Sequence, residues 1–289
     1  MLRQLRESDV DAVLAVYGKA WGDSRPIAAT DLRSWLRNPE VDPATLRVLE
    51  IDGEVVGYGD VTVADGVVAV EVAAPDNWDM FLAWAEDTAR DAEASRVRVL
   101  SYGGEALANA AAARGYFLWR SNYRMQIDFG SIAPDLSPPP KGIEIRPYSD
   151  DDPGRLLDAI NEVFAADPFF AHLTRGHFRE DYLNDPGMDP ALWMLASDDA
   201  DLVGFSLGFA EWHGNVDVGE VRSVGVRGRW RQRGLGEALV RSTFGALYAR
   251  GLRSITLGVD ASNETGAVRL YQRLGMRIAA QGDNWAFDL

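Results

Sequence analysis

Cysteine is absent from this chain of 289 residues. Its absence excludes disulfide bonds, thiolate metal sites and a cysteine nucleophile. Histidine is scarce, with three residues, and the spacing of His172, His177 and His213 matches no metal site. We therefore expect no bound metal.

Long apolar runs and positive charge are scarce as well. No run approaches the length of a membrane span, and the first residues lack the apolar core of a signal peptide, so we expect a cytoplasmic protein with no membrane contact. The formal net charge of -15 argues against nucleic acid as a partner, because binding phosphates requires a basic face. The remaining composition, 47% apolar and 25% charged, is typical of a globular protein long enough for two domains.

A proline-rich segment divides the chain into two similar halves. Residues 131–142 contain three consecutive prolines, which favour a stiff extended spacer. The flanking segments, 1–130 and 143–289, show the same order of strand and helix patterns, including a hairpin pattern at 48–58 and again at 194–205. The sequence predicts an α/β fold in which each half is a mixed sheet flanked by helices.

One short segment of the second half is typical of a phosphate-binding turn. A strand-like run ends at Val226, the pattern Arg231-x-x-Gly234-x-Gly236 follows, and an amphipathic helix then runs to Gly251. Glycines allow a tight turn whose amides point at one place, and the start of the helix adds the positive end of its dipole. Four arginines concentrate positive charge there, which indicates either an anionic ligand or a solvated basic face: Arg227, Arg229, Arg231 and Arg233.

Two other phosphate-binding patterns are excluded, and the first half lacks the turn. No Gly-Lys-Ser/Thr tripeptide occurs, and Leu239 stands where a dinucleotide fingerprint needs a small residue. At the corresponding place in the first half no glycine supplies a turn, and Asp76 and Asp79 would repel a pyrophosphate. We expect one phosphate site per chain, in the second half.

This turn, its preceding strand and the later segment 263–276 together resemble the GNAT superfamily of N-acetyltransferases. The tandem arrangement is most similar to the mycothiol synthase family and related actinobacterial two-domain members. The resemblance implies two tandem GNAT-like domains, of which residues 143–289 bind acetyl-CoA and residues 1–130 are degenerate. It implies that the co-substrate contacts Val224, Gly225, Val226, Arg231, Gln232, Arg233, Gly234, Leu235, Gly236, Glu237, Asn263 and Ala267.

The resemblance also implies catalytic residues. Glu220 takes the role of general base and Tyr271 that of general acid toward the departing thiolate. By strand alternation, Glu220 is expected to share a face with Arg222 and Val224. Each role has a structural alternative: Glu220 as the ion-pair partner of Arg222, and Tyr271 as a helix-packing residue.

The predicted reaction is direct transfer of acetyl to a small-molecule amine in a ternary complex, since no cysteine exists to carry the acetyl group. Two alternatives stay open at this point. The chain could be a non-catalytic acyl-CoA-binding regulatory module, or it could acetylate peptides or proteins. We expect a monomer or a homodimer.

Overall fold

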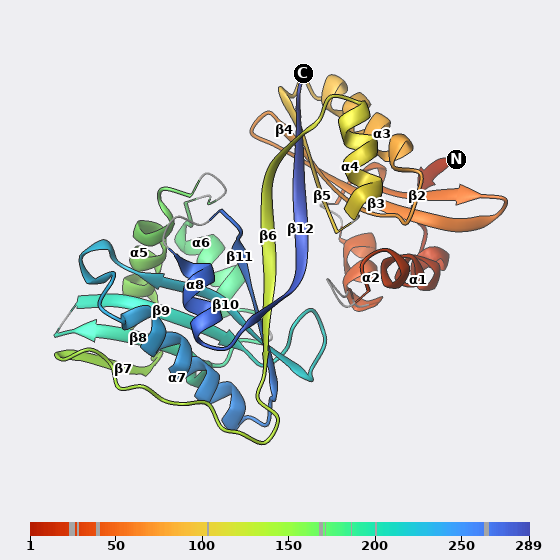
Figure 1. Cartoon of the computed structure of the whole chain (residues 1–289). Helices are drawn as coiled ribbons and strands as arrows, with labels where there is room; N and C mark the ends of the chain where they lie inside the picture. The colour runs from red at the N-terminus through yellow and green to blue at the C-terminus, as the bar shows by residue number, and fades with distance from the viewer. Residues whose placement is uncertain are drawn as a thin grey trace. The chain divides into compact units, whose positions relative to one another are not determined.

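The structure is a computed structural model of the whole chain. It describes residues 1–22, 27, 29–38, 41–102, 104–167, 170, 172–185, 187–199, 201–262 and 266–289. The chain forms two compact units (Figure 1). One contains residues 1–124, 259–265 and 278–289, and the other contains residues 125–258 and 266–277.

The first unit is a mixed sheet with helices on both faces. Its strands, in spatial order, run β1, β2, β3, β4, β5, β12 and β6. The strands are β1 (Leu2–Gln4), β2 (Leu46–Ile51), β3 (Glu54–Ala64), β4 (Val67–Ala73), β5 (Arg96–Ser101), β6 (Phe117–Asp128) and β12 (Arg277–Asp288), and the helices are α1 (Val10–Ala20), α2 (Ala29–Arg37), α3 (Trp78–Asp91) and α4 (Gly104–Ala113).

Among the described residues of this unit, apolar clusters lie on both faces of the sheet. On one face Phe81 and Leu82 of α3 and Leu107 of α4 pack against β-branched residues of β4 and β5. On the other face Val13 and Tyr17 of α1 pack against β2 and β3. The alternating valines of β4 and β5 fit this arrangement, because successive side chains of a strand point to opposite faces.

The second unit repeats this order of elements. Its sheet runs β6, β11, β10, β9, β8 and β7. The strands are β7 (Ile143–Pro147), β8 (Trp193–Asp198), β9 (Asp201–Phe209), β10 (Val218–Val226) and β11 (Ser254–Asp260), and the helices are α5 (Pro153–Phe164), α6 (Arg175–Phe178), α7 (Leu235–Ala249) and α8 (Ala267–Arg273). The predicted mixed α/β fold is confirmed.

Helices α7 and α5 pack on opposite faces of this second sheet. Leu235 and Leu239 of α7 join a buried cluster with Met194 of β8 and Val203 of β9. On the other face the ring of Phe164 in α5 lies 6.2 Å from the ring of Phe205 in β9, centroid to centroid. These two faces matter for the site, because each side chain of β10 points to one or the other of them.

The last strand of the chain, β12, pairs with β5. The pairing is antiparallel and runs from Asp283 opposite Ser101 to Asp288 opposite Arg96, and the Arg96 Nε donates a 2.5 Å hydrogen bond to Asp288 Oδ1. Residues 278–289 therefore complete the sheet of the first unit. The division of the chain at residues 131–142 rests on the sequence and stays a prediction.

The proline-rich segment that precedes β7 contains neither helix nor strand. Leu136 lies against α7 at Gly245, where an added Cβ would come within 2.7 Å of the leucine side chain. A glycine on the surface of α7 thus makes room for this extended segment. Among the helices of the described residues, none combines the length and the apolarity required to cross a bilayer.

Candidate active site

The site begins where two parallel strands of the second unit part. The pairing of β10 with β11 runs from Val218 opposite Ser254 to Glu220 opposite Thr256 and stops there, although β10 continues to Val226 and β11 to Asp260. All of these residues lie in the described part of the chain. Backbone groups of both strands past this point therefore face a gap in the ladder, and a peptide-like ligand can form hydrogen bonds with them.

A bulge in β10 changes which face its side chains point to. Pairing with β9 places Val221 opposite Gly208 but Ser223 opposite Leu207, so Arg222 is the extra residue. Before the bulge, an added Cβ on Gly219 would meet Leu247 of α7, whereas beyond it a Cβ on Gly225 would lie 2.4 Å from the ring of Phe205, on the α5 face. These two odd-numbered positions would share a face in a regular strand, so the bulge reverses the alternation.

We expect from the sequence that Glu220 shares a face with both Arg222 and Val224; the structure agrees for Arg222, but the expectation is wrong for Val224. Glu220 is opposite Phe209 in the register, on the α5 face, and Arg222 lies over the ring of that phenylalanine. Val224 is opposite Ser206, which hydrogen-bonds Thr243 of α7, so Val224 points to the other face. Strand alternation read from the sequence does not predict these faces, because the pairing of β10 with β9 determines that an extra residue occurs and where it lies.

The predicted phosphate turn lies between β10 and α7. A short 3₁₀ helix, Gly228–Trp230, leads into it, and Gly234 at the start of α7 has φ of 81°. Gln232 has φ of 60°, which is unusual for a residue with a side chain. The first helical hydrogen bond runs from the Ala238 amide to the Gly234 carbonyl, so the amides of residues 235–237 precede the bonded part of the helix. A helix start of this kind attracts anions.

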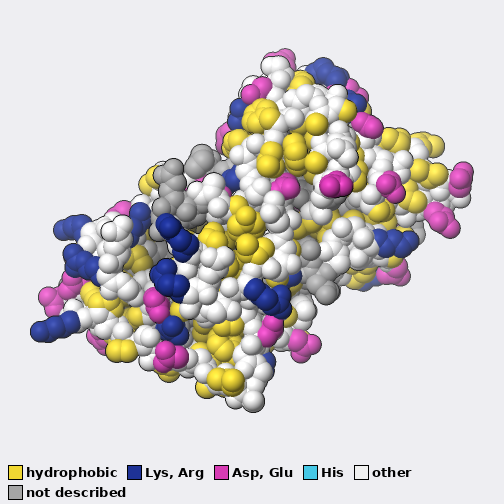
Figure 2. All heavy atoms as spheres, in the orientation of Figure 1, with side chains coloured by type: hydrophobic (Ala, Val, Ile, Leu, Met, Phe, Trp, Pro, Cys, Tyr) yellow, Lys and Arg dark blue, Asp and Glu magenta, His cyan; other side chains and the backbone are white. Residues whose placement is uncertain are grey.

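The arginines of this segment are held in different ways. Arg231 donates from Nε to the Val226 carbonyl at 2.8 Å, which closes the turn onto the end of β10. Arg227 forms an ion pair with Glu162 of α5 at 3.0 Å, and the Arg229 guanidinium lies 5.0 Å from the Trp230 ring centroid. Arg231 and Arg233 are both exposed. Figure 2 shows many Lys and Arg side chains on one face of the second unit.

Glu220 is the last residue of β10 that pairs with β11, at the point where these two strands begin to part. Its side chain is 19% exposed, and its Oε2 accepts a 3.0 Å hydrogen bond from Arg222 Nε. Burial raises the pKa of Glu220, the positive charge of Arg222 acts against this rise, and the negative charge of Asp185 adds to it. A carboxylate of raised pKa beside an open strand edge has the properties of a general base, although the ion pair shows that it also has a structural contact.

Tyr271 and Ala267 lie on α8. Ala267 is the first residue of that helix, after Gly266 with φ of 80°. Tyr271 is 7% exposed, and burial raises its pKa to about 12. A phenol with this pKa keeps its proton at neutral pH and can donate it. Asn263 lies outside the described residues.

The first unit differs from the second at the corresponding place. The parallel pairing of β4 and β5 continues from Val67 opposite Arg96 to Glu71 opposite Leu100, so these strands stay together for most of their length. Asn77, with φ of 66°, precedes α3 as Gly234 precedes α7.

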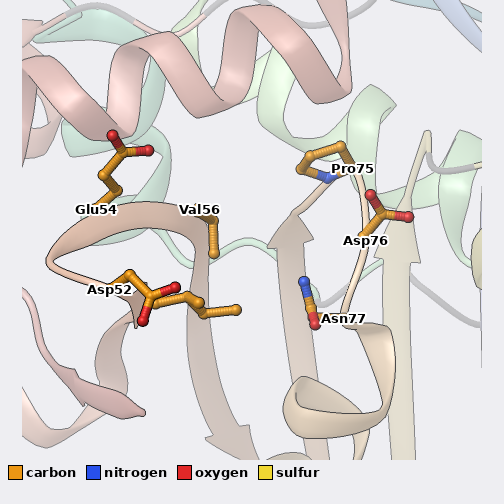
Figure 3. A pocket seen from close by; sticks show the side chains of 7 residues that line it. Asp52, Glu54, Val56, Pro75, Asp76 and Asn77 are labelled. Atoms are coloured by element: carbon orange, nitrogen blue, oxygen red, sulfur yellow. The ribbon is translucent and has the colours of Figure 1, made fainter.

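A cavity of about 500 Å³ lies beside this turn, lined by Ile51, Asp52, Glu54, Val56, Pro75, Asp76 and Asn77 (Figure 3). Its carboxylates repel a diphosphate. The closed strands and the acidic lining both disfavour binding of the same ligand in this unit.

Sequence reasoning did not identify Asp185 as part of the site. This residue follows a π-helical turn, Arg179–Leu183, and its Oδ2 accepts a 2.6 Å hydrogen bond from Arg222 Nη1. No local pattern marks it, because it lies 37 positions from Arg222 in the chain. A π-helical turn is uncommon and frequent at functional sites, but its sequence carries no clear signal.

Comparisons with known proteins show the family of this chain. Residues 157–276 match the acetyltransferase (GNAT) family. A protein of Streptomyces coelicolor named mycothiol acetyltransferase is 31% identical over 95% of this chain and 90% of its own length.

Two solved structures are similar over the whole chain. A GCN5-related N-acetyltransferase from Sphaerobacter thermophilus has a TM-score of 0.82 and 25% identity, covering 100% of this chain and 95% of its own. A tandem GNAT protein from the clavulanic acid biosynthesis pathway has a TM-score of 0.72 and 16% identity, covering 100% of this chain and 98% of its own. At this identity the likeness shows the fold alone.

Proposed function

Because the chain belongs to the GNAT acetyltransferase family, we propose that it transfers the acetyl group of acetyl-CoA to the amine of a small molecule, by direct attack while both substrates are bound. The observation that carries this proposal is the parting of β10 and β11 beside a turn lined with backbone amides. With no cysteine in the chain, no thiol is available for an acetyl-enzyme.

The residues present suit acetyl-CoA. The pantetheine arm is an amide chain, and the part of β10 from Val224 to Val226 offers it strand-like hydrogen bonds. The diphosphate would be held by amides from Gln232 to Glu237 and by the positive end of α7. Exposed arginines of the turn supply charge-assisted contacts, and Ala267 at the start of α8 approaches the arm from the β11 side.

Glu220 and Tyr271 supply the proton transfers. An ammonium group with a pKa near 10 must lose a proton before it attacks, and Glu220, whose pKa burial raises, takes that proton directly or through water. The thiol of coenzyme A has a pKa of about 8.5, so its departure is assisted by a proton from Tyr271. An amide of β10 that faces the gap stabilises the negative charge that develops on the carbonyl oxygen.

A small-molecule acceptor is supported by the relatives, which are named for mycothiol, and by charge. Glu220 and Asp185 with Arg222 form a partly buried cluster of two anions and one cation, which attracts a cationic amine. Peptides carry amines as well, so the test of this proposal includes both small amines and peptides as acceptors.

The test is release of free thiol from acetyl-CoA in the presence of small amines and of peptides. We expect transfer to a small amine, and intersecting initial-rate lines that indicate a ternary complex. Glu220→Gln should lower kcat/KM by about 100-fold or more with little change in acetyl-CoA affinity, and Tyr271→Phe should lower kcat. Glu105→Gln, an exposed change on α4, is the matched control.

Parallel lines would contradict direct attack, and transfer confined to peptides would contradict the acceptor class. Acetyl-CoA binding without thiol release on the whole panel would favour a regulatory binding module instead. Full activity of both active-site variants would refute the assigned roles.

A further inference from the structure

Arg222 is held by three contacts: one within its own strand β10, one with the loop after the π-helical turn, and one with β9. Its Nε donates to Glu220 Oε2 at 3.0 Å, and its Nη1 donates to Asp185 Oδ2 at 2.6 Å. The guanidinium carbon lies 3.4 Å from the ring centroid of Phe209. A planar guanidinium bonded along two edges and stacked on a ring has little freedom to turn, so the atom that faces Glu220 is fixed in direction.

The bulge explains why an arginine can occupy this position. Arg222 is the extra residue of β10 and has no partner opposite it on β9. Its side chain can therefore cover the ring of Phe209, whose own cross-strand partner is Glu220. Bulges next to active sites commonly re-aim one side chain in this way.

We propose that Arg222 is a positioning residue that orients and keeps ionised the Glu220 carboxylate, and that Asp185 anchors Arg222 for that task. The proposal deepens the function above and rests on the role of Glu220 as base. It also connects the π-helical turn to the chemistry, because Asp185 lies two residues after that turn ends at Leu183.

The charges around Glu220 oppose one another. Burial and the charge of Asp185 raise the pKa of Glu220, and Arg222 lowers it. Burial raises the pKa of Tyr182, on the π-helical turn, and the positive charge of Arg222 acts against this rise, so the phenol stays neutral. On β11 the residue opposite Glu220 is Thr256, which carries no charge. Removing the cation and removing the second anion should therefore shift the titration of Glu220 in opposite directions.

The experiment measures this titration in two ways: the pH profile of kcat/KM, and the carboxyl carbon resonance of Glu220 in protein labelled with ¹³C-glutamate, assigned with Glu220→Gln. In Arg222→Gln the midpoints of the kcat/KM profile and of the Glu220 resonance should both move to higher pH, by about one unit or more. At a pH below the wild-type midpoint, this shift corresponds to an approximately 10-fold loss of kcat/KM. In Asp185→Asn the amide oxygen can still accept from Arg222 Nη1 while the second negative charge is lost, so both midpoints should move to lower pH. Arg222→Lys keeps the positive charge, so the midpoint of its kcat/KM profile should stay within about half a pH unit of wild type.

Arg90→Gln, which breaks an exposed ion pair on α3, is the matched control and should leave both readouts unchanged. An equal loss of kcat/KM at every pH in Arg222→Gln, with an unmoved Glu220 resonance, would overturn the proposal. A shift of both variants in the same direction would also overturn it. The resonance needs no acceptor, so a wild-type protein without transferase activity would contradict the proposed function while the titration still decides the role of Arg222.

Discussion

Replacing Gly234 by alanine tests the phosphate turn directly. Gly234 has φ of 81°, and an added Cβ there would meet no atom within 4 Å, so the cost of the substitution is conformational and not steric. The left-handed backbone costs an L-residue about 1–2 kcal/mol. We expect the free energy of unfolding to fall by that amount, with a decrease in melting temperature of about 2–4 °C per kcal/mol.

The same substitution should weaken acetyl-CoA binding. If the strain is relieved by rotation of the turn, the amides after Gly234 no longer point at one place. Loss of one hydrogen bond to a charged group costs about 1.5–3 kcal/mol, which corresponds to roughly a 10- to 100-fold increase in Kd. Isothermal titration calorimetry with acetyl-CoA measures this increase.

Two glycines of the same segment serve as controls. Gly251, at the end of α7, has φ of 96° and equally open surroundings, so Gly251→Ala should cost the same stability without changing Kd. Gly228, in the 3₁₀ helix, also has open surroundings but no positive φ, so Gly228→Ala should change neither quantity substantially. A wild-type Kd for Gly234→Ala, or an equal loss of affinity in Gly251→Ala, would refute the assignment of this turn.

Three further predictions follow from contacts, charge and pairing. Gly225→Ala should destabilise the protein by about 1–3 kcal/mol in thermal unfolding, because its Cβ would lie 2.4 Å from Phe205; an unchanged melting temperature would show that β10 tolerates a side chain there. Hydrogen bonding from Arg146 lowers the pKa of the buried Asp152 from 3.8 to about 2, so this carboxylate stabilises the fold above pH 4 by about 2 kcal/mol and the stabilisation disappears as the pH falls through 2. In urea unfolding, the free energy of unfolding of wild type should therefore exceed that of Asp152→Asn by less at pH 2 than at pH 4. Asp151→Asn, at an exposed position, should match wild type at every pH. A difference between wild type and Asp152→Asn that does not change with pH would contradict the assigned ion pair. Calorimetry should give one acetyl-CoA per chain, since the strands of the first unit remain paired, and a stoichiometry of two would contradict this.

The features that the sequence predicted well are local ones. The glycine and arginine turn, the helix that follows it and its end at Gly251 all depend on residues within about 30 positions of one another. Backbone preferences of glycine and the spacing of apolar residues determine such elements before any long-range contact forms. The repeated order of strand and helix patterns similarly indicated the mixed α/β fold.

The features that the sequence did not predict depend on partners far away in the chain. Strand alternation placed Val224 on the face of Glu220, but the register of β10 against β9 inserts Arg222 as an extra residue and reverses the faces beyond it. Asp185 reaches the same arginine from 37 positions away. The pairing of β12 with β5 joins residues such as Arg96 and Asp288, which are 192 positions apart.

Sequence alone thus determined which residues could make an anion-binding turn and in which order strands and helices follow one another, because these properties reside in short stretches of backbone. Tertiary structure alone decided where β10 and β11 part, which way the side chains after the bulge point, and which carboxylates Arg222 joins. These depend on hydrogen-bond register and on packing between distant strands, and a shift of one residue in register is enough to exchange the two faces of a strand.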